Sequence, residues 1–95
     1  MIELGGNIKL NGFKELDPPT LIIVKKLVGN YAKKIGEEAT QFSELFLDLK
    51  SERERCELRV SLTTGKKKFN SEVKDQNLFF AIDKALNTIL TEAKK

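Results

Sequence analysis

Few side chains in this 95-residue chain are suited to acid–base or nucleophilic chemistry. It contains no histidine and one cysteine, Cys56, so it has neither a catalytic imidazole nor the ligands of a zinc site. Adjacent carboxylates at Glu37–Glu38 and Glu52/Glu54 fall in expected loops, where acids are usually solvated. No GxxxxGK[ST] or GxGxxG motif occurs, and Gly5–Gly6 is too isolated to form a phosphate loop. The sequence therefore predicts no enzyme, metal, cofactor or small-molecule substrate, and Cys56 is expected to be a buried apolar side chain.

The side chains best suited to chemistry are lysines, and that chemistry is contact with phosphate. Lys66, Lys67 and Lys68 follow Gly65 directly, at the expected tip of a hairpin. The net charge is +3, and the excess lies in residues 51–95, where ten basic residues face seven acids. A one-sided excess is typical of phosphate binding, but lysines at a turn also discourage strand aggregation, so a merely solvated tip is the alternative. The later lysines, none with an acid four residues away on its own helical face, are Lys74, Lys84, Lys94 and Lys95.

Helix and strand patterns place these lysines on an α+β fold. Ile2 to Leu10 alternates apolar and polar residues, which predicts one strand interrupted at Gly5–Gly6. Asp17 is a plausible helix cap before Pro18, and Gly36 a plausible stop. The inner stripe of this helix is predicted as Leu21, Val24, Leu27, Val28, Tyr31 and Ile35.

The sequence predicts three strands and a helix in the second half of the chain. In residues 42–50 odd positions from Ser43 to Leu49 face inward, so Phe42 and Phe46 face outward. Residues 56–63 and 66–73 continue as hairpin partners, and Asp75 is expected to cap the last helix. The inward set of the middle strand is Cys56, Leu58, Val60 and Leu62, and the inner stripe of the last helix is Leu78, Phe79, Ile82, Leu86, Ile89 and Ala93.

The order β-α-β-β-β-α predicts one four-stranded sheet with two helices packed on one face, similar to a double-stranded-RNA-binding domain. No linker or repeat interrupts the pattern, so residues 1–95 are expected to form a single domain. The apolar runs are too short to span a bilayer, and MIELGG lacks the order of a signal peptide. We therefore expect a cytoplasmic protein without a membrane partner.

Two aromatic residues, Phe46 and Phe80, fall outside the expected buried stripes. Base stacking is one role for such rings, since aromatics on sheets stack bases in RNA-recognition domains. The alternating aromatics of those domains are absent here, so protein contact or partial burial is the favoured interpretation.

The segment ELFLDLKSERERCELRVSLTTGKKKFNSEVKDQNLFFAIDKAL resembles the ribosome hibernation-promoting factor and ribosome-associated inhibitor family. The likeness consists of the β-α-β-β-β-α order, a charged turn between the second and third strands, a short glycine turn, and an acidic cap before the AID of the last helix. Residue-level likeness covers about the last 40 residues.

The resemblance implies a protein that binds the rRNA of the small ribosomal subunit and keeps idle ribosomes inactive. Where the family's last helix carries Lys and Arg, this chain has Thr88 and Thr91, so the expected binding of phosphate by this helix is weaker. The chain stops after this helix, so the resemblance implies the short, non-dimerising type, a monomer off the ribosome. Positions matching the family's rRNA-contacting residues are Lys26, Lys33, Lys74, Lys84 and Lys95; with the hairpin tip, the candidate RNA-binding residues are Lys26, Lys33, Lys66, Lys67, Lys68, Lys74, Lys84 and Lys95.

Two other function classes remain open. A general double-stranded-RNA binder uses a similar α-β-β-β-α arrangement and would bind free duplex as tightly as subunits. A protein-interaction module would use the outer sheet face around Phe46, and its binding would be insensitive to salt.

Overall fold

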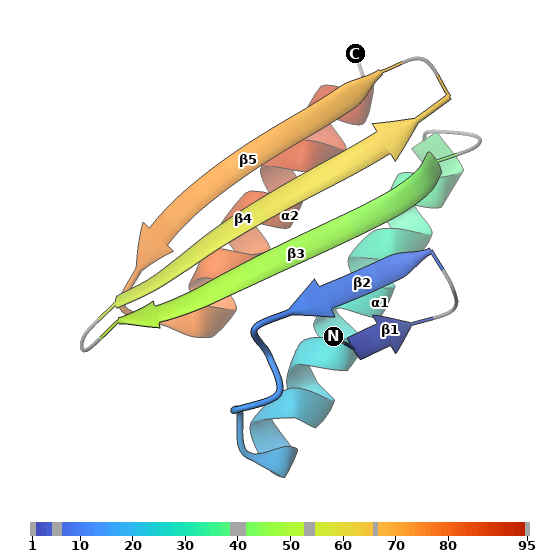
Figure 1. The fold of residues 1–95 in the computed structure, drawn as a ribbon. Helices are drawn as coiled ribbons and strands as arrows, with labels where there is room; N and C mark the ends of the chain where they lie inside the picture. Colours follow the sequence, from blue (N-terminus) through green and yellow to red (C-terminus); the bar gives the residue numbers. More distant parts are fainter. Residues whose placement is uncertain (1, 5–6, 39–41, 53–54, 66, 95) are drawn as a thin grey trace.

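The computed structural model describes residues 2–4, 7–38, 42–52, 55–65 and 67–94, which form two layers (Figure 1). One layer is a five-stranded sheet in the order β1-β2-β3-β4-β5. The other consists of helices α1 (Pro18–Glu38) and α2 (Leu78–Lys94), which lie on the same sheet face and run in the same direction. The strands are β1 (Ile2–Leu4), β2 (Ile8–Asn11), β3 (Phe42–Glu52), β4 (Arg55–Thr64) and β5 (Lys68–Asp75).

The prediction of four strands was wrong, because the first expected strand is an antiparallel hairpin of two. β1 pairs with β2 so that Ile2 lies opposite Leu10, and Leu4 opposite Ile8. Residues opposite one another in an antiparallel pair share a sheet face. The alternation of apolar and polar residues from Ile2 to Leu10 is therefore the same for a hairpin as for a single strand. β2 then pairs parallel to β3, which requires α1 as the crossover. This N-terminal hairpin distinguishes the fold from the α-β-β-β-α arrangement of a double-stranded-RNA-binding domain.

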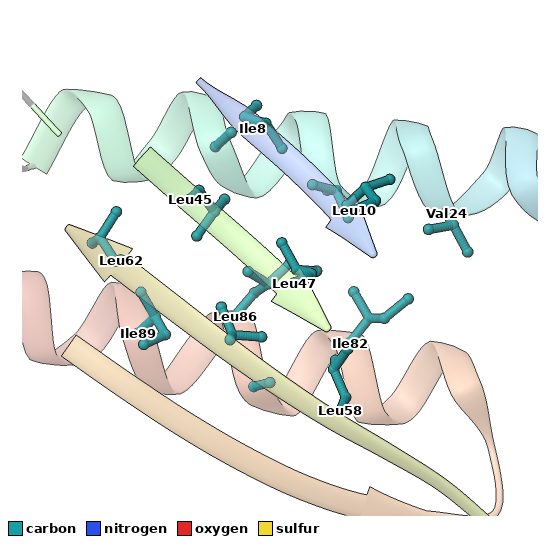
Figure 2. Packing of buried hydrophobic residues seen from close by; sticks show 14 of the residues in the cluster. Ile8, Leu10, Val24, Leu45, Leu47, Leu58, Leu62, Ile82, Leu86 and Ile89 are labelled. Atoms are coloured by element: carbon teal, nitrogen blue, oxygen red, sulfur yellow. The ribbon is translucent and has the colours of Figure 1, made fainter. Parts of the chain in front are cut away.

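The predicted α+β class and the placement of both helices on one sheet face are confirmed. Figure 2 shows how leucines of β3 and β4 meet side chains of both helices between the two layers. The three leucines predicted to face inward from β3 are at most 4% exposed, and the predicted stripes of the helices supply the opposite wall. Buried residues labelled in Figure 2 are Ile8, Leu10, Val24, Leu45, Leu47, Leu58, Leu62, Ile82, Leu86 and Ile89.

Helix α1 begins where the sequence predicts and ends later. The Asp17 carboxylate accepts hydrogen bonds from the Thr20 amide (3.4 Å) and the Thr20 hydroxyl (2.8 Å), which confirms Asp17 as the cap. The hydrogen bond from Thr20 is the main reason that the pKa of Asp17 lies below its usual value. The helix continues through Gly36 to Glu38, so Gly36 is not its stop.

Gly36 instead lies beside Phe42. A Cβ at Gly36 would lie 3.5 Å from Cε1 of the Phe42 ring, and Phe42 packs against the core rather than facing outward as predicted. The reason is a register shift in β3 between Phe42 and Glu44, which reverses the alternation at the start of the strand.

Helix α2 has a different cap from the one predicted. Asn77 Oδ1 accepts hydrogen bonds from the amides of Phe79 (2.9 Å) and Phe80 (3.2 Å), so Asn77 is the N-cap. Asp75 lies two residues earlier, and its Oδ1 accepts a hydrogen bond from the Asn77 amide at 2.9 Å. The two residues therefore form consecutive parts of one turn between β5 and α2.

Candidate nucleic-acid interface

Helix α1 carries a ridge of lysines on the side that faces away from the sheet. The buried positions of the helix are Val24, Val28, Ala32 and Ile35. Lys26 and Lys33 lie about half a turn from Val24 around the helix, and both are exposed. They are seven residues apart, which places them on one line about 10 Å from each other along the axis.

The lysines of this ridge form no ion pair with another described residue. Between Pro18 and Gly36 the helix contains four lysines and no acidic residue, and its two acids, Glu37 and Glu38, are its last residues. Among the described residues, neither Lys26 nor Lys33 has a carboxylate oxygen within 4.0 Å. Lys25 and Lys34, which are also exposed, were not among the predicted site residues; the signal that identifies them is the run without acids from Pro18 to Gly36. We define the α1 ridge as Lys26 and Lys33, which face away from the sheet, together with Lys25 and Lys34 on its flanks.

A hydrogen bond between side chains links α1 to α2. The Tyr31 hydroxyl donates a hydrogen bond to Asp83 Oδ1 at 2.5 Å. The Lys34 ammonium lies 5.5 Å from the centre of the Tyr31 ring, within the range of a cation–π contact. Burial of the phenol raises the pKa of Tyr31 to about 12, and the Asp83 carboxylate adds to the increase.

The predicted basic hairpin tip is a tight turn between β4 and β5. The Thr64 amide donates to the Lys67 carbonyl at 2.8 Å, and the Lys67 amide donates to the Thr64 hydroxyl at 3.2 Å. Lys67 and Lys68 are both exposed, whereas Lys66 lies outside the described residues. Figure 1 shows this turn at the end of the molecule where both helices finish.

The outer sheet face carries lysines too, together with carboxylates that pair with some of its cations. Arg59 contacts Glu57 at 3.4 Å and Glu72 at 3.6 Å, and Lys9 contacts Glu44 at 3.4 Å. A hollow of about 260 Å³ lies between β4 and β5 on this face. With cations and carboxylates alternating over the strands, the face is mixed in sign. The residues that line the hollow are Arg59, Val60, Ser61, Asn70, Ser71 and Glu72.

Lys74 belongs to this mixed outer face. It is exposed near the end of β5, and its partner directly across the strand pair is Glu57. Lys68 lies six residues earlier on the same strand, about 20 Å away. The outer sheet face and the α1 ridge look in opposite directions, because the helices cover the inner face of the sheet (Figure 1).

Lys84 has an acidic partner that the sequence analysis did not anticipate. Its ammonium lies 3.3 Å from Asp75 Oδ2, nine residues earlier in the chain. The hydrogen bond from the Asn77 amide, and then the contact with Lys84, lower the pKa of Asp75. Helical spacing does not predict this pair, because Asp75 lies before α2 and is brought close to Lys84 by the turn between β5 and α2. Lys84 is consequently less available to a phosphate than the α1 ridge.

The structure brings together only part of the predicted RNA-binding set. Lys26 and Lys33 share one ridge, and Lys84 lies on the same layer of helices. Lys67 and Lys68 lie at one end of the molecule, and Lys74 is on the mixed outer face. Lys95 lies outside the described residues. Lysines close in sequence are therefore distributed over two faces and one end.

The helix positions of Thr88 and Thr91 contribute no cation. The Thr88 hydroxyl donates a hydrogen bond at 2.9 Å to the carbonyl of Lys84 in its own helix, and Thr91 is exposed. On this layer, the positive charge therefore lies mainly on α1.

Both aromatic residues singled out in the sequence lie outside the core. Phe46 is half-buried on the outer sheet face, where its neighbours in register are Lys9 and Ser61. Phe80 is 63% exposed on α2, and Ile22 and Ile23 of α1 are 57% and 52% exposed. The layer of helices thus combines unpaired lysines with exposed apolar side chains.

Cys56 is half-buried rather than fully buried as predicted. Burial raises the pKa of its thiol, and the carboxylate of Asp75, its partner across the strand pair, raises it further. No group of three or more Cys, Asp or Glu side chains in the described ranges could hold a metal ion. Neither described helix is long and apolar enough to cross a membrane.

The arrangement of strands and helices is similar to that of two solved structures. The N-terminal domain of Protein Y from Thermus thermophilus matches with a TM-score of 0.72 and 14% identity, over 92% of each chain. A ribosomal subunit interface protein from Coxiella burnetii matches with a TM-score of 0.64 and 10% identity, over 92% of this chain and 90% of that one. No protein-family model matches the sequence, and no curated protein matches it. At these identities the likeness is one of fold, and this chain has the fold of Protein Y and of the ribosomal subunit interface protein.

Proposed function

We propose that this chain is a non-enzymatic, cytoplasmic protein that binds the rRNA of the small ribosomal subunit as a monomer and holds idle ribosomes inactive. The observation that carries the proposal is the α1 ridge: lysines without ion-pair partners in the described part of the chain, on a fold shared with a ribosomal subunit interface protein. The resemblance of residues 44–86 to hibernation factors supports the same function.

The α1 ridge is suited to phosphate because none of its lysines forms an ion pair with another described residue. A lysine already paired with a carboxylate must lose that contact before it can bind phosphate, whereas Lys26 and Lys33 lose only water. Each lysine that neutralises a phosphate releases counterions, so affinity depends on salt and is largely independent of base sequence. We propose the α1 ridge as the main contact and the exposed tip at Lys67–Lys68 as a second contact, at the end where the helices finish.

The test is co-sedimentation of the protein with purified small ribosomal subunits over a salt series. We expect Lys26→Gln/Lys33→Gln to bind about tenfold more weakly at 0.1 M salt and to reduce the slope of log K against log salt by about 1.5, because two phosphate contacts are lost. The matched control is Lys50→Gln/Lys74→Gln, which removes the same charge from strand positions that both lie opposite Glu57. We expect this control to bind like the wild type.

Competing functions predict different results in the same assay. Free duplex RNA that displaces the protein from subunits at equal concentration would identify a general double-stranded-RNA binder. Wild-type protein that remains in the supernatant at low salt would rule out ribosome binding. Equal losses in the two double variants would mean that total charge, rather than the α1 ridge, determines binding.

A further inference from the structure

Phe80 is an aromatic side chain presented to solvent from a well-anchored backbone. Its ring is 63% exposed, the largest exposed fraction among the large apolar side chains that the structure describes as exposed. The side chain of the N-cap Asn77 accepts hydrogen bonds from the amides of Phe80 and Phe79, and Phe79 itself packs against the core. Phe80 therefore adds little to the packing of the fold, and its position is set by the first turn of α2.

The same side of α2 contacts α1. Asp83, one turn after Phe80, accepts the hydrogen bond from Tyr31, and residues three apart lie on the same side of a helix. Since α1 and α2 run in the same direction (Figure 1), Phe80 lies at the level of the α1 turn that precedes Tyr31. Lys26 and Asn30 are exposed on α1 within about 5 Å of that level along the axis.

An exposed aromatic ring beside unpaired lysines fits a ligand that is both anionic and planar. Lysines bind phosphates, and a ring such as that of Phe stacks on a base when the base is unpaired and accessible. A paired duplex satisfies only the lysines, because its bases are stacked within the helix. The charge of the α1 ridge also opposes a basic protein surface at this position.

We propose that Phe80 stacks on the base of an unpaired nucleotide in the RNA whose phosphates bind the α1 ridge. This proposal rests on the proposed function and adds the kind of RNA that this surface recognises: a bulge, loop or strand end next to a phosphate backbone. Phe80 carries no charge, so it contributes affinity that does not change with salt, whereas the lysines contribute the salt-dependent part.

The test measures the affinity of Phe80 variants for purified small ribosomal subunits and for two labelled RNA hairpins, one with a single bulged adenosine and one fully paired. Phe80→Leu keeps the apolar character and removes the aromatic face, so we expect about 5- to 100-fold weaker binding to subunits and to the bulged hairpin. The salt slope should remain that of the wild type. Phe80→Tyr and Phe80→Trp retain an aromatic ring and should bind within about threefold of the wild type.

Ile23→Ala is the matched control, because it removes another exposed apolar side chain from the layer of helices. We expect it to change affinity less than twofold. If Phe80→Leu binds like the wild type, or if the Tyr and Trp variants are as weak as Phe80→Leu, the stacking proposal is wrong while ribosome binding stands. If the wild type fails to bind subunits but prefers the bulged hairpin through Phe80, the proposed function fails and stacking stands. Binding to neither probe overturns both.

Discussion

At the scale of single residues, Gly12 has a conformation that other residues adopt at a cost. Its φ is +84°, in the left-handed region, and a Cβ at this position would lie 2.1 Å from the carbonyl oxygen of Leu49. The close approach lets the chain leave β2 beside β3 and bury Phe13 fully in the core before α1 begins. Neither Gly12 nor Phe13 belongs to a periodic pattern, so the sequence predicts no role for either residue.

Gly12→Ala is therefore expected to lower the free energy of unfolding by at least about 2 kcal/mol, from left-handed strain together with the clash at Leu49. Gly29→Ala is the matched control. Gly29 lies within α1, and a Cβ there would meet nothing within 4 Å, so we expect a gain of about 0.5–1 kcal/mol. Urea unfolding of the two variants measures both effects. Equal stability of the two would contradict this account of Gly12.

At the scale of elements, the type of each helix and strand could be predicted, but several ends and partners could not. Alternation and helical spacing depend on neighbours in sequence, so β3, β4, β5 and both helices were found. The cap of α2 was misassigned because both Asp75 and Asn77 are good cap residues. Which of the two residues caps α2 depends on where β5 ends. Because Asp75 is the last residue of β5, the cap is the later residue, Asn77.

Asn77→Ala is expected to destabilise the protein by about 1 kcal/mol, since two amides of the first turn of α2 lose their acceptor. For a domain of this size this corresponds to a fall in Tm of about 4–8 °C. Asn77→Asp is the control, because it retains the acceptor and places a negative charge at the helix N-terminus. Thermal unfolding monitored by circular dichroism compares the three proteins. A variant Asn77→Ala as stable as the wild type would show that Asp75 alone supports the turn.

At the scale of the whole molecule, function depends on which charges share a face. Two layers separate the α1 ridge from the lysines of β5, although both groups read equally well as basic clusters in the sequence. The hydrogen bond from Tyr31 to Asp83 joins the helices that present the ridge and Phe80. The protonation state of the Tyr31 phenol therefore affects the stability of the layer of helices.

Tyr31 should make stability fall at high pH. Its pKa is raised from about 10 to about 12 in the folded protein, so the stabilisation is fully present below pH 10 and is lost as the pH rises from 10 to 12. Tyr31→Phe lacks this hydrogen bond at every pH, so we expect its deficit in stability to shrink over that interval. Urea unfolding of both proteins between pH 8 and 12 gives the difference. A deficit that stays constant with pH would mean that the phenol contributes no proton-linked stability.

The sequence by itself determined the α+β class, the apolar side of each element, the cap at Asp17 and the absence of histidine chemistry, because these depend on composition and on spacing between near neighbours. Only the tertiary structure decided that Ile2–Leu10 forms two strands, that Phe42 turns inward, and that Lys84 is paired with Asp75. The alternation of apolar and polar residues is the same for a hairpin and a straight strand. An ion pair between a turn and a helix follows no repeat in the sequence. The separation of the lysines has the same cause: spacing along the chain specifies the side of an element, whereas packing of the two layers specifies the side of the molecule.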